Sequence, residues 1–348
     1  MNVGLRPFSL PLAEPLDTAR GTVERREGLL VRVESGDSEP GASAVGVGEA
    51  TPLSGWTEGD DECEAALDEA AEAVEAGADL ESVLADLDDA PAARHALDLA
   101  LADLGASREG VALYRYLGSA DRIESVPVNA TVGDAPVAET VAAAESAADA
   151  GFDCVKLKVG ARSVSADIER IDAVADALDG VGLRADANGA WDRATAQQFL
   201  DAVGDRLAYV EQPLPATDIA GLAALSGPVA LDETLARVAL DDALDADPEA
   251  VVLKPMALGG PRPAVAAGRR AREAGVEPVV TTTVDGSVAR TAAVHVAAAI
   301  PDRPACGLAT ASRLESDLGP DIAPVADGRA VVPQGAGNGT ADTWGHRD

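Results

Sequence analysis

Three lysines stand at the ends of short apolar runs, where they could act on a substrate. Lys156 and Lys158 end one run, and Lys254 ends another. They are the only lysines in the chain, since the other 24 of its 27 basic residues are arginines. Arginine keeps its proton in proteins, whereas a lysine amine can be tuned to act as a base. The retained lysines therefore indicate acid–base chemistry.

Three carboxylates, Asp186, Glu211 and Asp232, end further runs between those of the lysines. Converging carboxylates stay ionised together only when a cation holds them. Hard oxygen ligands with room for water suit Mg²⁺, with Mn²⁺ as a possible substitute. A proton removed beside a substrate carboxylate leaves an enediolate, which a cation and an ammonium group stabilise. The pattern predicts metal-dependent proton abstraction from a small-molecule carboxylate.

The runs that carry these groups belong to a repeat of β-rich segments and Ala-rich helical segments. This repeat predicts an α/β fold, a (β/α)8-type barrel or modified TIM barrel, in which reactive groups come from the C-terminal strand ends. Strands two and six are opposite, so the lysines should face each other across the mouth. A doubly wound sheet is the alternative, but no Gly-rich phosphate loop follows any run. The eight predicted strands are residues 126–132, 154–159, 182–187, 207–212, 229–233, 251–255, 278–283 and 306–310.

The flanking segments predict an α+β capping domain. Residues 1–120 contain the alternating runs GLLVRVES and GVGEATPL, which suggest an antiparallel sheet with the turn ESGDSEPGAS, followed by helices. Residues 121–318 would form the barrel. Residues 319–348 would return to the cap, with ADGRAVVP as one more strand.

The charge of the chain excludes some partners. Sixty acidic residues give a formal net charge of −33. Such a surface disfavours nucleic acid and anionic membranes, which require clustered basic residues. The acids are spread along the whole chain, as is typical of proteins adapted to high salt. No secretory signal or spanning segment is evident, so we expect a cytoplasmic protein; the oligomeric state stays open.

Five motifs resemble those of the enolase superfamily: VKLKVG, LRADANGAW, YVEQPL, LDET and VVLKPMALGG, in this order. Paired lysines on strand two with a single lysine on strand six resemble its muconate-lactonizing subgroup. The mandelate-racemase subgroup would have a His on strand seven, where this chain has Thr281, Thr282 and Thr283. The resemblance covers nearly the whole chain.

This resemblance implies a role for each site residue. Lys158 would abstract the α-proton, and Lys156 would tune Lys158. Lys254 would stabilise the enediolate from the opposite face. Asn188 would support the metal site. The Mg²⁺ ligands would be Asp186, Glu211 and Asp232.

The cap motifs REGLLVRVES and GVGEATPLSGWTEG resemble the o-succinylbenzoate synthase family, as does Arg184 near the metal site. That family dehydrates a cyclohexadiene carboxylate on the route to menaquinone. The segment from Thr51 to Trp56, which includes Ser54, and the loop over residues 11–20 would close over the substrate. Further candidate contacts or supporting residues are Thr281, Ser287, Gly259 and Gly260.

Other functions fit the same lysines and metal ligands. N-acylamino acid racemases, dipeptide epimerases and muconate-type cycloisomerases share the predicted intermediate. Ala309 stands where several relatives carry an acid, which disfavours recognition of a substrate ammonium by an epimerase. A Schiff-base aldolase that uses Lys254 and a non-catalytic binding barrel are the remaining alternatives.

Overall fold

A curved parallel sheet forms the centre of the barrel. The computed structural model describes residues 1–18, 21–34 and 44–345. Seven strands pair in the order β11-β10-β9-β8-β7-β6-β5. Most are short and almost wholly buried, as expected for strands covered on both faces. The strands are β5 (Ala130–Val132), β6 (Cys154–Lys158), β7 (Gly182–Asp186), β8 (Tyr209–Glu211), β9 (Val229–Leu231), β10 (Ala250–Leu253) and β11 (Glu277–Val280).

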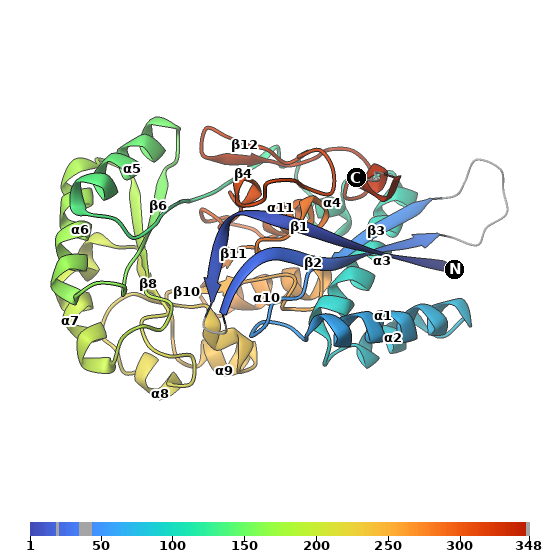
Figure 1. The fold of residues 1–348 in the computed structure, drawn as a ribbon, viewed down its shortest axis with the longest axis horizontal. Helices are drawn as coiled ribbons and strands as arrows, with labels where there is room; N and C mark the ends of the chain where they lie inside the picture. The colour runs from blue at the N-terminus through green and yellow to red at the C-terminus, as the bar shows by residue number, and fades with distance from the viewer. Residues whose placement is uncertain (19–20, 35–43, 346–348) are drawn as a thin grey trace.

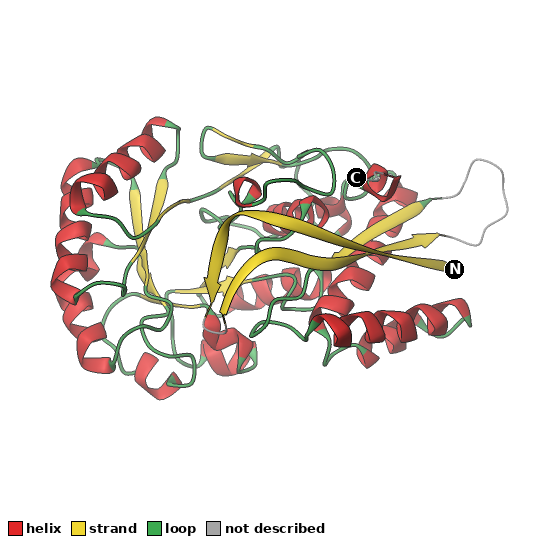
Figure 2. Cartoon of the chain, in the orientation of Figure 1, coloured by secondary structure: helices red, strands yellow, loops and turns green. Residues whose placement is uncertain are grey.

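A helix follows each of these strands and covers the outside of the sheet (Figure 2). Ser163 and Asp192 cap α6 and α7 by accepting a hydrogen bond from the main-chain N–H of the third residue of each helix. The predicted alternation of strands and helices is thus confirmed from β5 to α11. The helices are α5 (Val137–Asp149), α6 (Val164–Ala177), α7 (Arg193–Val203), α8 (Ile219–Leu222), α9 (Leu240–Leu244), α10 (Pro261–Glu273) and α11 (Ser287–Ala299).

The predicted eighth strand, residues 306–310, is wrong as a strand. Cys306 and Gly307 make only isolated bridges, to Val128 and to Thr281. Thr281 Oγ1 donates to the Gly307 carbonyl at 2.8 Å, so a side-chain hydroxyl takes the place of a ladder N–H. Through these two bridges, residues 306 and 307 still connect the segment after β11 with the segment before β5.

The cap contains the predicted antiparallel sheet, which is confirmed in the order β1-β2-β3. Most of the predicted turn, residues 35–43, lies outside the described residues. The loop predicted over residues 11–20 is wrong up to residue 18, because β1 continues there and pairs with β2 across a bulge; residues 19 and 20 lie outside the described residues. The cap elements are β1 (Asn2–Thr18), β2 (Gly21–Glu34), β3 (Val45–Ala50), α1 (Asp60–Glu75), α2 (Leu80–Asp86), α3 (Pro91–Glu109) and α4 (Leu113–Tyr116).

The C-terminal segment contacts both parts of the molecule. Its predicted single strand is a hairpin, β12 (Val325–Ala326) and β13 (Arg329–Val331), that pairs with β4 (Ser125–Pro127). Further on, the Trp344 carbonyl accepts a hydrogen bond of 2.9 Å from Arg6 in β1. The C-terminal segment therefore completes the cap, as the predicted fold requires.

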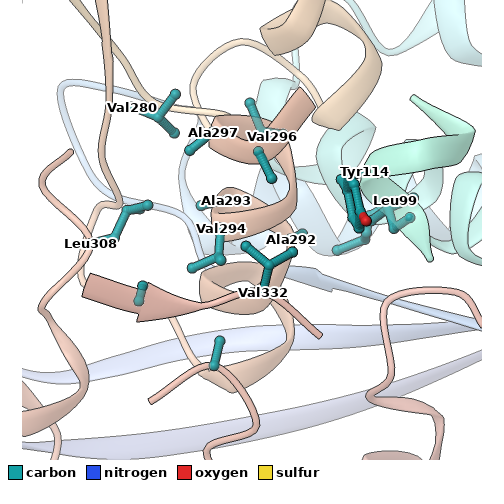
Figure 3. Packing of buried hydrophobic residues seen from close by; sticks show 14 of the residues in the cluster. Leu99, Tyr114, Val280, Ala292, Ala293, Val294, Val296, Ala297, Leu308 and Val332 are labelled. Atoms are coloured by element: carbon teal, nitrogen blue, oxygen red, sulfur yellow. The ribbon is translucent and has the colours of Figure 1, made fainter. Parts of the chain in front are cut away.

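Helix α11 joins the cores of barrel and cap. All 13 of its residues are buried. Val280 and Leu308 lie on one side of it, and Leu99 and Tyr114 of the cap lie on the other (Figure 3). In Figure 1 the curved sheet and the long cap helices accordingly lie on opposite sides of this region. No helix in the described part of the chain is long and apolar enough to cross a membrane.

Candidate active site

The pairing register of three adjacent strands brings two lysines and two carboxylates together. Lys158 is level with Asp186, and Asp186 is level with Glu211. Lys158 Nζ lies 2.7 Å from Asp186 Oδ2, and Lys156 Nζ lies 3.0 Å from the same oxygen. Lys156 Nζ also lies 3.0 Å from Glu211 Oε1. Because Lys156 and Lys158 are two residues apart, their side chains lie on the same face of β6, as predicted.

Lys254 follows β10 and has a different environment. Its ammonium group is paired with the Asp232 carboxylate. The Trp56 ring of the cap covers it, with Nζ 3.5 Å from the ring centroid, which is cation–π geometry. The side chain of Lys254 is 9% exposed, against 36% for that of Lys158. The two candidate acid–base groups therefore differ strongly in their access to water.

Burial and mutual repulsion affect the three carboxylates differently. Burial, followed by repulsion from Asp186, raises the pKa of Glu211 to about 7. Burial also raises the pKa of Asp232 to about 6, although Lys254 opposes this shift. Burial disfavours ionised Asp186 too, but Lys156 and Lys158 outweigh it and lower its pKa. Carboxylates at the ends of neighbouring strands require compensating cations if they are to stay ionised together.

The donor set matches a hard divalent cation. Asp186, Glu211 and Asp232 offer carboxylate oxygens at the ends of three consecutive strands, which suits Mg²⁺. Within the described residues, no three His, Cys, Asp or Glu side chains converge closely enough to form a preassembled metal site. Instead, lysine ammonium groups bind the carboxylate oxygens. A metal would therefore compete with Lys156 and Lys254 for these oxygens.

Two residues at the mouth hold left-handed backbone conformations. Asn188 has φ 45° and Gln212 has φ 39°, which are strained for non-glycine residues. Asn188 lies in the site, since its Oδ1 accepts from Lys158 Nζ at 2.7 Å, and its support of the metal stays a prediction. Its Nδ2 donates to Glu233 Oε1 at 3.0 Å. Asn188 thus links the candidate base to the loop after β9.

Two supporting residues were not predicted from the sequence. Gln212 Oε1 accepts from the main-chain N–H of Asp232 at 3.0 Å. Arg170 on α6 is 1% exposed and donates to the Lys158 carbonyl at 2.9 Å. The position of Gln212, directly after Glu211, was a usable signal. Nothing in the helical pattern marked Arg170 as turning toward the strand.

Arg184 lies inside the barrel, two residues before Asp186 on β7. Its guanidinium group donates to the Ala305 carbonyl at 2.6 Å and pairs with Glu277 at 3.3 Å. It also stacks over the Tyr209 ring, 4.7 Å from the centroid. These contacts engage Arg184 within the barrel interior, and its role toward a substrate stays a prediction.

The other candidate contacts are dispersed. Thr281 binds the Gly307 carbonyl, and the Ser287 N–H donates to Asp317 at 2.6 Å. Gly259 and Gly260 approach cap helix α3 so closely that an added Cβ would meet Arg94 and Asp98. Cap packing accounts for both glycines. Their substrate roles, like those of Thr281 and Ser287, stay predictions.

Ser54 and Trp56 lie on the cap segment between β3 and α1. Ser54 is exposed and forms an isolated bridge with Thr57. Trp56 reaches the barrel mouth, where it covers Lys254. The structure therefore brings Trp56, the three lysines, the three carboxylates and Asn188 into one region.

Comparisons with known proteins give one consistent family. The model of the family described as "Enolase C-terminal domain-like" matches residues 139–341. An o-succinylbenzoate synthase of Thermobifida fusca is 42% identical over 60% of this chain and 67% of its own length. An L-Lys-D/L-Arg epimerase of Methylococcus capsulatus is 32% identical over 97% of this chain and 98% of its own.

A solved structure agrees with this similarity over nearly the whole chain. The dipeptide epimerase of Methylococcus capsulatus, complexed with Mg and the dipeptide L-Arg-D-Lys, has a TM-score of 0.84 and 30% identity. The similarity covers 97% of this chain and 98% of that one. The fold is thus shared from the cap to the C-terminal segment.

Proposed function

The chain belongs to the enolase superfamily, and we propose that it is a Mg²⁺-dependent o-succinylbenzoate synthase of the muconate-lactonizing subgroup. The observation that carries the proposal is the set of three lysines around three strand-end carboxylates. Two features favour dehydration over other reactions of this site. The synthase relative has the higher identity, at 42% against 32% for the epimerase. Ala309 also offers no carboxylate for a substrate ammonium.

Lys158 is the proposed base. In its neutral form it takes the proton from the carbon beside the substrate carboxylate, and the C–H electron pair passes into an enediolate. The same ammonium then gives its proton to the departing hydroxyl on the same face. The C–O bond breaks, water leaves and the ring becomes aromatic. Lys158 is suited to this exchange because its side chain is the more exposed of the two facing groups.

Lys254 is the proposed electrostatic partner. Its ammonium group, paired with Asp232, stabilises the negative charge that develops on the substrate carboxylate. Trp56 excludes water from this ammonium, which strengthens its interaction with the enediolate. The proposed Mg²⁺ ligands are Asp186, Glu211 and Asp232. When bound, Mg²⁺ supplies a Lewis acid that makes the α-proton more acidic.

The direct test supplies the purified protein with Mg²⁺ and the cyclohexadiene carboxylate. Formation of o-succinylbenzoate is followed by the rise in aromatic absorbance. We expect turnover that EDTA abolishes and added Mg²⁺ restores. No turnover across a range of salt concentrations would contradict the synthase assignment.

Racemisation of an N-acyl amino acid or a dipeptide is the second candidate. Lys158 and Lys254 come from opposite strands, as two-base proton exchange requires, and the epimerase relative aligns over 97% of the chain. Exchange of the substrate α-proton in D₂O separates the two functions. Rapid α-deuteration of the N-acyl amino acid or dipeptide, with no dehydration of the cyclohexadiene carboxylate, would favour a racemase or epimerase.

A further inference from the structure

A buried polar cluster joins the cap to the barrel next to the active site. Its centre is Glu49, the residue before the last of β3, which is 0% exposed. Beside it lies Arg26 of β2, which is 2% exposed. Burying charged groups is costly unless each finds specific partners. Their partners lie on other segments of the fold.

Glu49 caps a helix of the barrel from the cap domain. Its Oε1 accepts from the Gly286 N–H at 2.7 Å, and its Oε2 accepts from the Ala289 N–H at 2.8 Å. Gly286 is the N-cap of α11 and has no side chain to satisfy these donors. The carboxylate therefore takes over a function that α11 lacks locally, and β3 is fixed to the start of α11.

Arg26 fixes a third segment to the same point. Its Nη2 donates to the Thr51 carbonyl at 2.8 Å, and its Nη1 donates to the Pro52 carbonyl at 3.0 Å. Its Nε donates to the carbonyl of Val284, a residue at φ 63° in the loop before α11. One guanidinium group thus holds the start of the cap segment against a strained barrel loop.

Thr51 connects the two charged residues. Its hydroxyl donates to Glu49 Oε1 at 2.5 Å, while its carbonyl accepts from Arg26. The segment then turns, with the Trp56 N–H bonded to the Leu53 carbonyl at 2.9 Å. The turn ends with the Trp56 ring over Lys254. A short, internally bonded path therefore runs from the buried cluster to the active-site lysine.

We infer that Glu49 and Arg26 form a cross-domain clamp that positions Trp56 over Lys254. Both are positioning residues, since they act through the segment from Thr51 to Trp56. The clamp keeps the Lys254 ammonium shielded and oriented toward the barrel mouth. The inference goes beyond the proposed function, because it holds for any reaction in which Lys254 takes part.

The chain allows a direct test, because mass spectrometry can follow the acetylation of each of its three lysines separately. The full chain is treated with N-hydroxysuccinimide acetate, and the Lys254 rate is divided by the Lys158 rate. Trp56→Ala gives the value for an unshielded Lys254. In Glu49→Gln and Arg26→Met we expect the ratio of the Lys254 rate to the Lys158 rate to rise about fivefold, toward its value in Trp56→Ala. The reason is that the lost hydrogen bonds allow the segment from Thr51 to Trp56 to open.

Asp103→Asn is the matched control. Asp103 is 2% exposed and accepts from the N–H groups of Val47 at 2.8 Å and Asn338 at 2.6 Å. It therefore also joins distant segments of the cap, but none of its bonds reaches the segment from Thr51 to Trp56. We expect this variant to lose thermal stability without changing the Lys254 ratio.

An unchanged ratio in Trp56→Ala, or equal ratios in Glu49→Gln and Asp103→Asn, would overturn the inference. If circular dichroism shows that a clamp variant does not fold, Thr51→Val and Arg26→Lys decide in its place. Thr51→Val removes one hydroxyl, and Arg26→Lys keeps the charge but loses the three-way bonding. Because the assay uses no substrate, its outcome is independent of whether the dehydration is observed.

Discussion

At the scale of single residues, the site separates two lysines that have the same chemistry. The side chain of Lys158 is 36% exposed, and its ammonium group donates hydrogen bonds to Asp186 and Asn188. Lys254 is enclosed by Asp232 and Trp56. A base must lose and regain its proton, whereas an electrostatic partner must keep it. These surroundings support the assignment of the proton transfer to Lys158.

Lys158→Ala tests this division of labour. The substitution removes the proposed base, so we expect proton transfer to fall by at least about 10²-fold, within the usual range for general acid–base catalysis. The measurement is the turnover rate together with α-deuterium exchange in D₂O. The control is Arg193→Ala, which removes a 58% exposed cation at the start of α7 that pairs with Asp218 rather than with a residue of the site. Equal activity of both variants would exclude Lys158 as the base.

Glu49 gives a pH dependence of stability. Burial, followed by repulsion from Asp285, raises its pKa from 4.5 to about 7. Between these values the folded state holds a proton that the unfolded state has released. The free energy of unfolding therefore falls as pH rises from 4.5 to 7, by up to about 3 kcal/mol from this group.

The measurement compares urea unfolding of the wild type and Glu49→Gln across this pH range. Asp103, whose pKa burial raises to about 6, titrates in both proteins, so the difference between them isolates Glu49. We expect the wild type to lose more stability toward pH 8 than the variant does. Parallel curves would show that Glu49 does not titrate in this window.

At the scale of elements, the loops after β8 and β9 hold the metal-ligand strands in register. Gln212 accepts from the N–H groups of Asp232 and Thr234, and its Nε2 donates to the Leu214 carbonyl at 2.9 Å. This side chain replaces the main-chain ladder where β8 and β9 have ended. The Gln212 side chain therefore positions the Asp232 carboxylate.

Gln212→Met should weaken metal binding. The substitution leaves two buried N–H groups without an acceptor and releases Asp232, so we expect Mg²⁺ affinity to fall about 10- to 100-fold. Calorimetric titration with Mg²⁺ measures this change. Gln197→Met is the control, because Gln197 makes a similar pair of bonds to the Ser226 main chain on the exposed surface. A loss of the same size in Gln197→Met would contradict the prediction.

The packing of β3 on α3 provides a second test at this scale. A Cβ added to Gly48 would lie 1.9 Å from the Ala96 carbonyl oxygen. Gly48→Ala must push the strand and helix apart, and we expect a loss of about 1–3 kcal/mol in unfolding free energy. Gly133→Ala is the control, since within the described residues no atom beyond its two chain neighbours lies within 4 Å of the added Cβ. Thermal or urea unfolding of both variants measures the difference.

The parts of the site that depend on strand periodicity could be predicted from the sequence. Lys156, Lys158 and Asp186 follow from β6 and β7, because alternation along a strand determines which face a side chain takes. The contacts of the Arg184 side chain could not be predicted in this way, and the eighth strand was predicted wrongly. Arg184 turns to an acid on β11, and Gly307 pairs with a threonine hydroxyl. Such long-range partners leave no periodic signal.

At the scale of the whole molecule, cap and barrel share one hydrophobic core around α11. Cap residues Leu99 and Tyr114 belong to the same buried cluster as Val280 of β11 (Figure 3). The two parts should therefore unfold together, and the clamp at Glu49 stands on the border of this shared core. The active site lies at the same junction, since Trp56 comes from the cap and Lys254 from the barrel.

The net charge of −33 gives the last prediction. Mutual repulsion among dispersed acids destabilises the compact state, and salt reduces it, because the screening length falls from about 10 Å at 0.1 M to about 3 Å at 1 M. We therefore expect the unfolding temperature to rise by several degrees between 0.1 and 2 M KCl. Differential scanning calorimetry measures it, and sucrose at matched osmolality controls for solvent exclusion. If the temperature is unchanged in KCl, or rises equally in sucrose, charge repulsion does not limit the stability of this fold.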